Sequence, residues 1–395
     1  MADRISTLPE AIICHILSFL QTKQSAATSI LSKRWKNIWL SVPVLDFRPT
    51  RITDATTNFR FNDFVYSVFI SRDPALPIKS FSLHVKYKCG YINTTGFPLI
   101  PSFTKWLNYV LQRGVEHLTL DVATPGGLPL LPISIFTCRT LVVLHLTVFW
   151  VQYSFSSVEL PLLKTLNLEF ITFPEDVDFM LLLDGCPILE KLFISNVFSN
   201  CQEDSLISSN KWKNFSLGNL IVADVADVDF SYFRFPFQAL QNVRSLSIKI
   251  AKEHVRIDAI PTFHNLTYLN LTSLNYKWCI LVEFLKHCPK LQNLSVDEAG
   301  GMRETWTRKD DKESWVDLEF VPQCLSLHLK TCHLFSFLGL QGEVLLARYI
   351  LKNARVLETM NIKTIGKSKS KIRRCLSSFP RASSMCKVIV NRFPM

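Results

Sequence analysis

An apolar triplet at positions i, i+3 and i+5 returns along most of the chain from about residue 78. The clearest copies are Leu141/Leu144/Leu146, Leu163/Leu166/Leu168, Leu189/Leu192/Ile194, Val243/Leu246/Ile248, Leu266/Leu269/Leu271 and Leu291/Leu294/Val296. Weaker copies are Ile78/Phe81/Leu83, Val115/Leu118/Leu120, Leu217/Leu220/Val222, Cys324/Leu327/Leu329 and Leu357/Met360/Ile362. Counted at the third residue, successive copies between Leu120 and Val296 lie 22 to 28 residues apart. Such a period is typical of a stack of similar structural units.

The triplet also predicts the structure of each unit. Its second and third residues lie two positions apart and therefore share one face of a short strand. A single unit cannot bury that face, whereas stacked neighbours bury it continuously. We therefore expect a leucine-rich-repeat solenoid of the α/β class, with parallel strands on its concave face and helices on its convex face. The apolar stretches 179–183, 281–285 and 345–351 are the expected helices.

Three cysteines occupy one repeat position. Cys138, Cys186 and Cys288 each precede the first residue of a copy by three positions. Because equivalent positions lie in different layers, we expect small buried residues there and not metal ligands. The eleven cysteines form no Cys-x-x-Cys pair. Together with the lack of a secretory signal, this predicts reduced thiols and a cytoplasmic or nuclear location.

The first forty residues contain a second strong pattern. Apolar residues recur at every fourth position, with two more beside them, and so form one broad helical stripe: Leu8, Ile12, Ile16 and Leu20, with Ile13 and Leu17. Thr7 and Glu10 have the spacing of a capping box, and Pro9 is expected in the first turn.

Two further helices are expected before Pro43. The first covers residues 24–31, and the second starts at Ser32 and carries Trp35 and Trp39 one turn apart. Three helices in under fifty residues bury too little surface to be stable alone. Either a partner protein covers the stripe, or the helices form a cap on the larger domain. A signal peptide is the weakest alternative, because Pro9 and the following Glu10 interrupt its flank.

This segment resembles the F-box, the adaptor-docking module of SCF-type ubiquitin ligases. The resemblance lies in Leu8-Pro9, Ile16-Leu-Ser-Phe-Leu20, Leu31-Ser-Lys-Arg-Trp35 and Trp39-Leu-Ser-Val-Pro43. Gln21 stands where the family usually has proline. The resemblance implies docking to a Skp-type linker protein, which the family connects to a cullin and a RING subunit. The implied contact residues are Leu8, Pro9, Ile12, Ile16, Leu17, Leu20, Leu31 and Trp35.

The C-terminal stretch resembles the FBD module, which closes plant F-box proteins that carry leucine-rich repeats. The matching segments are Tyr349–Ala354, Leu357–Met360, Leu376–Ser384 and Cys386–Val390. The segment Phe335–Gln341 is more apolar than the family usually shows. The resemblance to plant F-box/FBD/LRR-repeat proteins covers the whole chain and implies four parts: an F-box (1–47), a connecting segment (48–77), repeats (78–317) and an FBD cap (318–395).

Two regions have unusual charge. Residues 297–317 interrupt the period with eleven charged residues in twenty-one, and their Trp306 and Trp315 are candidate contacts for a target protein, unless they pack on the solenoid edge. Residues 363–392 hold nine lysines and arginines and no acidic residue, in a chain of net charge +11. Their cluster at 367–374 fits a solvated loop, a nuclear-import signal or a nucleic-acid patch. Missing aromatic residues argue against nucleic-acid binding.

The sequence contains no recognisable catalytic, phosphate-binding or metal-ligand motif and no apolar run of eighteen residues. We therefore expect a non-catalytic subunit without a cofactor or a membrane span. The function implied by the resemblance is that of a substrate-recruiting adaptor of an SCF-type ligase. A repeat-based scaffold that binds proteins outside ubiquitin ligation is the alternative.

Overall fold

The fold is taken from a computed structural model. It describes residues 5, 7–88, 103–124, 128–199, 215–226, 237–250, 260–274, 278–298, 320–365 and 369–392. The chain divides into two compact units, and each is described by itself. The first comprises residues 1–189 with 197–205, and the second comprises 190–196 with 206–395.

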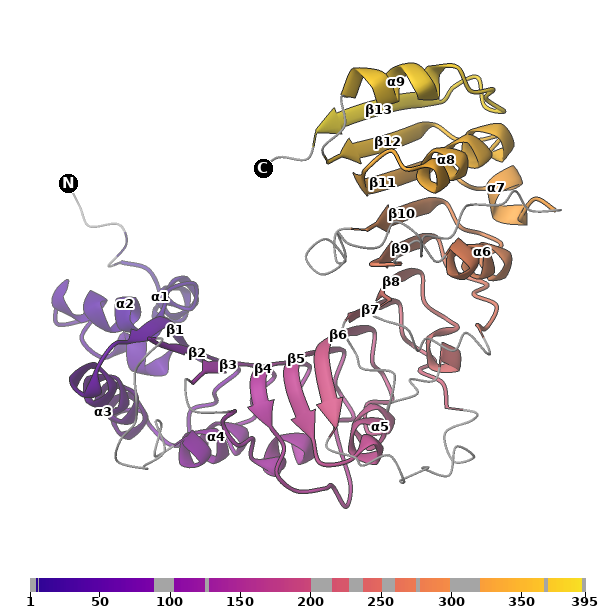
Figure 1. The fold of residues 1–395 in the computed structure, drawn as a ribbon. Coiled ribbons are helices and arrows are strands. Elements are labelled where there is room, and N and C mark those ends of the chain that lie inside the picture. Colours follow the sequence, from indigo (N-terminus) through magenta and orange to yellow (C-terminus); the bar gives the residue numbers. More distant parts are fainter. Residues whose placement is uncertain are drawn as a thin grey trace. The chain divides into compact units, whose positions relative to one another are not determined.

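The first unit begins with helices and continues as strands that alternate with helices (Figure 1). Its elements are α1 (Glu10–Leu17), α2 (Thr22–Ala27), η1 (Thr28–Ile30), η2 (Ile38–Ser41), β1 (Val44–Ile52), α3 (Ala55–Ser71), β2 (Ser80–Tyr87), α4 (Phe103–Leu111), β3 (His117–Ala123), η3 (Ile133–Thr137), β4 (Val143–Trp150), β5 (Thr165–Phe173) and α5 (Asp176–Asp184). The strands β1 to β5 lie side by side in chain order, and all are parallel.

The second unit begins with a strand and also has helices between several of its strands. Its elements are β6 (Lys191–Ser199, with its first six residues in this unit), β7 (Val222–Ala226), η4 (Phe237–Leu240), β8 (Ser245–Lys249), β9 (Tyr268–Thr272), α6 (Trp278–His287), β10 (Asn293–Asp297), α7 (Gln323–Leu327), β11 (Thr331–Phe337), α8 (Gln341–Asn353), β12 (Thr359–Thr364), α9 (Lys369–Ser377) and β13 (Lys387–Arg392). The strands are again parallel and in chain order. The helices α6, α7 and α8 follow one another along the same side of these strands (Figure 1).

The strand register explains the apolar triplets. In the first unit the repeated side chains form two rows across β3, β4 and β5, Leu118/Leu144/Leu166 and Leu120/Leu146/Leu168, and all six are fully buried. The second unit has the matching rows Leu246/Leu269/Leu294 and Ile248/Leu271/Val296 across β8, β9 and β10. The predicted α/β repeat fold with parallel strands is confirmed.

The copy expected at Leu217/Leu220/Val222 is wrong by three positions. Ala223 pairs with Leu246 of the next strand, and Val225 pairs with Ile248. The copy is therefore Leu220/Ala223/Val225. The prediction was misplaced because the spacing rule searches for large apolar side chains, and the buried row here is filled by the small Ala223.

The copy expected at Cys324/Leu327/Leu329 is wrong by five positions for the same reason. Leu327 ends α7 and is exposed. Cys332 pairs with Leu294, and Leu334 pairs with Val296. The copy is Leu329/Cys332/Leu334, in which a cysteine fills the buried row.

One copy lies before the first expected one. Val42, Leu45 and Phe47 have the i, i+3, i+5 spacing, and all three are buried. Leu45 pairs with Phe81 of β2, and Phe47 pairs with Leu83. The sheet thus begins within the segment assigned to the F-box, and residues 48–77 contain the end of β1 and all of α3.

The repeat-equivalent cysteines Cys138, Cys186 and Cys288 are buried as predicted. Burial raises the pKa of the Cys186 thiol to about 12, so this group remains protonated at neutral pH. Within the described ranges, His, Cys, Asp and Glu side chains do not gather in threes as metal ligands. The helices of the described part of the chain are all too short or too polar to cross a membrane.

Candidate docking surface on the N-terminal helices

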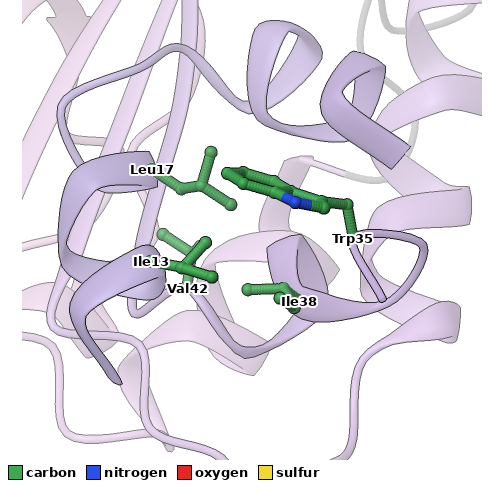
Figure 2. Packing of buried hydrophobic residues seen from close by; sticks show 5 residues of the cluster. All are labelled: Ile13, Leu17, Trp35, Ile38 and Val42. Carbon is green, nitrogen blue, oxygen red and sulfur yellow. The ribbon is translucent and has the colours of Figure 1, made fainter. Parts of the chain in front are cut away.

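The N-terminal helices enclose a small core of their own. Figure 2 shows its five buried members, which come from α1, from the turns after η1 and from the chain around η2: Ile13, Leu17, Trp35, Ile38 and Val42. Partly buried residues pack around them, namely Leu8, Cys14, Leu20, Trp39 and Val44. The module is therefore internally packed, although its core is small.

Local hydrogen bonds determine where the first two helices begin and end. α1 has Pro9 at its N-cap, so the cap predicted at Thr7 is wrong. At the other end of α1, the Ser25 hydroxyl donates to the Leu17 carbonyl at 3.0 Å. The Gln21 N–H donates to Gln24 Oε1 at 3.3 Å before α2. Proline, the usual family residue at this position, has no N–H for that bond.

The predicted third α-helix is replaced by turns and the short 3-10 helix η2. The Trp35 N–H donates to the Ser32 carbonyl at 3.1 Å, so Ser32 starts a turn. The Arg34 guanidinium donates to the Leu8 carbonyl. This bond ties the turns to the residues before α1, and the neighbouring Trp35 ring packs in the core. Trp35 lies in the core and Trp39 packs against it, without a continuous helix between them.

The predicted contact residues separate into a surface group and a core group. Ile12 and Leu31 are 47% and 63% exposed, and Pro9 and Ile16 are exposed as well. Leu8 and Leu20 are half-buried against the core. Leu17 and Trp35 are only 1% and 5% exposed.

Leu17 and Trp35 therefore lie in the core beneath the exposed residues, and the contact role expected for them stays a prediction. The sequence pattern could not separate these groups. Ile12 and Ile13 are adjacent in sequence, so they lie about 100° apart around α1, and both belong to one broad apolar stripe. In the structure Ile13 faces the core and Ile12 faces outward.

Sequence reasoning missed three exposed apolar residues, Ile5, Phe19 and Ile30, and Ile30 is 86% exposed. Phe19 extends the outward row of Ile12 and Ile16 by a further turn, and its ring meets His15 edge-on at 5.0 Å between centroids. We call Ile12, Ile16 and Phe19 the α1 row. We call Ile30 and Leu31 the η1 pair. The sequence did contain a signal for this exposure. Ile30 and Leu31 are adjacent and branched and lie at a helix end, where one helix face cannot bury both side chains.

The module is fixed to the first repeat strand. The Asp46 N–H in β1 donates to Thr22 Oγ1 at the start of α2, at 2.7 Å, and both residues are buried. Arg72, directly after α3, is also buried and donates from Nη1 to the Val42 carbonyl at 2.7 Å. Burial lowers the pKa of the Arg72 guanidinium. These bonds connect the helices to β1 and α3, so the exposed apolar residues keep a fixed position beside the first repeats.

The other face of the sheet in the first unit carries polar side chains. His84 and Asp121 are paired across β2 and β3, with Nδ1 and Oδ2 3.4 Å apart. His145 lies on the next strand. Burial lowers the pKa of both His84 and His145, and for His84 the Asp121 carboxylate partly opposes this shift. This face is a candidate for target contacts, whereas the predicted contacts Trp306 and Trp315 lie outside the described residues.

Three family models match the chain. The F-box domain matches residues 5–47, and the FBD matches residues 317–362. The leucine-rich repeats of the FBD-associated F-box protein At5g56370 match residues 103–231. The matches lie in the same order as the three modules inferred from the sequence.

Relatives in Arabidopsis thaliana match nearly the full chain. The F-box/FBD/LRR-repeat protein At3g26920 is 30% identical, with 98% of this chain and 96% of the relative covered. The F-box/LRR-repeat protein At2g42720 and the FBD-associated F-box protein At5g56370 are also 30% identical, each with 98% of this chain and 99% of the relative covered. The F-box, the repeat sheet and the FBD segment are thus matched both separately and as one chain, and the protein belongs to the F-box/FBD/LRR-repeat family.

Proposed function

We propose that this protein is a substrate-recruiting adaptor of an SCF-type ubiquitin ligase. In this function the N-terminal helices bind a Skp-type linker protein, through which a cullin and a RING subunit are reached. The observation that carries the proposal is the set of exposed apolar side chains above an already complete core. Ile12, Ile16 and Leu31 contribute to no internal core in the described structure, and yet they are large and branched.

Physical chemistry favours a protein partner for these side chains. Large apolar residues that are exposed in a group mark interaction sites more often than those exposed singly. Burial of one such residue at the centre of an interface is worth about 2 kcal/mol when measured by truncation. The α1 row has spacings of four and three residues, so it offers a partner one side of α1 and of the turn that follows it, where Phe19 lies.

The chain itself is proposed to supply no catalytic group. A target held on the repeats is brought close to the ubiquitin-conjugating enzyme, and the gain in rate comes from this proximity. The polar face of the first unit, with His84, Asp121 and His145, is the proposed side for a target protein. The proposed location is the cytoplasm, the nucleus or both.

The proposal is tested by co-expression of the full chain with a Skp-type linker protein and quantitative pull-down. Ile12→Ala with Ile16→Ala should weaken binding by roughly 30-fold or more, because two interface side chains are truncated. Leu162→Ala is the matched control, since Leu162 is 49% exposed in the first unit and lies between β4 and β5. Unchanged binding by the double variant would contradict docking through the α1 row.

A second pair of substitutions tests the residues at the start of the N-terminal module. Leu8→Ala with Pro9→Ala should abolish the pull-down and leave the circular dichroism spectrum of the repeats unchanged. If the full chain is soluble and monomeric alone, and the linker protein neither binds nor improves its yield, the function is that of a repeat scaffold outside ubiquitin ligation. A single co-expression experiment therefore distinguishes the ligase adaptor from the repeat scaffold.

A further inference from the structure

Two neighbouring strands of the first unit, β4 and β5, share an unusual backbone near their carboxyl ends. Val148 and Phe170 have φ values of 67° and 53°, which lie in the left-handed region. A residue in this region interrupts the alternation of side chains along a strand. Phe170 and the preceding Glu169 consequently both reach the surface, whereas Ile171 is fully buried.

The fold does not require an aromatic residue at this position. In three other repeats the residues with the same conformation are small and polar, namely Asn196, Ser273 and Ser336. Asparagine adopts the left-handed region more readily than β-branched or bulky residues do. Phe170 is 44% exposed, so burial recovers only part of the cost of its conformation. A role in binding therefore explains Phe170 better than a role in folding.

Two more large apolar side chains are exposed beside Phe170. Leu130 and Trp150 form a parallel bridge, in which the Leu131 N–H donates to the Trp150 carbonyl at 2.9 Å. On its other side Trp150 pairs with Thr172, two residues after Phe170. The register thus places these side chains on one face of three adjacent segments. We call Leu130, Trp150 and Phe170 the apolar patch, and exposed groups of this kind mark interaction sites.

The charge beside the apolar patch is negative. The strands β4 and β5 contain no lysine or arginine, and Glu169 is their one acidic residue. His145 on the same face stays neutral at pH 7, because burial lowers its pKa. Among the residues that the structure describes, no cation pairs with the Glu169 carboxylate. A chain of net charge +11 therefore has a local surplus of negative charge beside exposed aromatic rings.

We propose that the apolar patch binds a linear target segment in which an arginine stands next to a large apolar residue. The guanidinium would lie over the ring of Trp150 or Phe170 and pair with the Glu169 carboxylate. A guanidinium suits both contacts, because it is planar, weakly hydrated and always charged. The apolar neighbour would cover the rest of the patch. The proposal deepens the proposed function and rests on it only in calling the bound segment a target.

The local charge favours a basic peptide over a nucleic acid or an anionic membrane. Both alternatives present phosphates, and proteins hold these with lysine and arginine side chains. The strands that carry the patch supply neither residue, and Glu169 would repel a phosphate. A cationic segment gains from the same carboxylate.

The test begins with a phage-displayed library of random twelve-residue peptides, selected on the full chain. Enriched peptides should contain arginine beside leucine, isoleucine, valine, phenylalanine or methionine. One of them is then synthesised with a fluorescent label and titrated by anisotropy. Replacement of its arginine by glutamine should weaken binding at least ~10-fold, because the cation–π contact and the ion pair are both lost.

Two variants of the protein locate the contact. Trp150→Ala should weaken the peptide at least ~10-fold. Leu162→Ala, at an exposed leucine before β5, is its control and should have no effect. Glu169→Gln should weaken binding roughly threefold to tenfold and reduce its dependence on salt. Asp184→Asn removes an exposed carboxylate at the end of α5 and should leave the affinity unchanged.

A third variant separates binding from folding. Phe170→Asn places in β5 the residue that β6 has at the equivalent position, Asn196. The thermal midpoint should stay constant or rise, because asparagine tolerates this backbone, whereas peptide affinity should fall at least ~3-fold. A clear loss of stability with unchanged affinity would assign Phe170 to the fold and contradict the proposal.

Other results would also overturn the proposal. These are a library that enriches no peptide or acidic peptides, and an affinity that Trp150→Ala leaves unchanged. Binding of single-stranded RNA or of anionic lipid vesicles that Trp150→Ala abolishes would assign the patch to another class of partner. Linker-protein pull-down keeps the two proposals apart. Its loss with peptide binding retained refutes the ligase adaptor alone, and the reverse result refutes the target site alone.

Discussion

At the first strand of the repeats, β1, a helical module covers the chain and presents apolar side chains outward, whereas at the last strand, β13, a single helix packs against the strand and presents cations. Every solenoid needs atypical units at its ends, because a middle unit left open would expose its buried rows to water. The apolar end is suited to a partner that buries area. The cationic end instead presents exposed charges, which stay hydrated.

The comparison predicts that a core substitution at the N-terminal end abolishes linker-protein binding, whereas one at the C-terminal end does not. Trp35→Ala should destabilise the N-terminal module by about 3–5 kcal/mol, because it empties the largest site in a five-residue core. Linker-protein binding should be lost together with module structure, measured by urea unfolding and pull-down. In contrast, Ile16→Ala should change stability by less than ~0.5 kcal/mol while binding falls. Equal destabilisation by both variants would contradict the division into core and surface groups.

The corresponding substitution at the last end is Leu376→Ala, which should destabilise the α9–β13 cap by about 2–4 kcal/mol. Linker-protein binding should be retained, because the affected residues belong to the second unit. Hydrogen exchange of β13 amides should rise while that of α1 amides stays constant. Faster exchange in α1 would show that the two ends unfold together.

The substitution Arg72→Met tests how the N-terminal module is attached to the repeats. This change removes the donor to the Val42 carbonyl and should cost about 1–3 kcal/mol, because a buried carbonyl is left unpaired. The first unit should show the loss in urea unfolding. Arg51→Met, at an exposed arginine in β1, is the control and should be nearly neutral.

The histidines of the first unit predict how acid affects its stability. Burial lowers the pKa of His84 and His145 below their ordinary value of 6.5, so the unfolded state binds protons more readily than the folded state. Stability is therefore complete above about pH 6.5 and falls as the pH drops through the lowered pKa values. The thermal midpoint should decrease between pH 7.5 and 5.5, and His84→Gln with His145→Gln should flatten this slope. An unchanged slope would assign the acid sensitivity to other groups.

The smallest expected effect concerns the cations of α9. Lys371→Gln with Arg374→Gln should change the free energy of unfolding by less than ~0.5 kcal/mol, since both side chains are exposed. A clear gain in stability would show that mutual repulsion strains this end. A clear loss would show that these cations belong to the internal structure, and the contrast between the two ends would weaken.

Much of the fold was predictable because a buried row demands a regular spacing. The triplets of β3, β4 and β5 are leucines except for Val115, and the register places the strand residues of each where the pattern required them. The two misplaced copies lie at Ala223 and Cys332, where a small side chain fills the row. Spacing rules weigh hydrophobic size, whereas the row requires only that the side chain be apolar and fit its neighbours.

The exposed apolar residues of the N-terminal module were predictable in position and less so in composition. Helical periodicity found the stripe of α1 but could not assign Ile12 to the surface and Ile13 to the core, because the stripe was wider than one buried face. Trp35 was predicted as a contact, and yet a large ring in a small module is the most effective core residue available. That choice depends on the path of the chain after α2, which no periodic pattern encodes.

Val42 is a member of the N-terminal core and also the first residue of the earliest triplet, with Leu45 and Phe47. The N-terminal core and the first repeat triplet consequently share Val42. A cut between the N-terminal module and the repeats would therefore open one of these two cores. A fragment that ends at residue 47 would lack the rest of β1, and one that starts at residue 78 would bare the edge of β2. A chimera that joins the N-terminal module to the repeats of another protein therefore has to include the chain through α3 and the Arg72 that follows it.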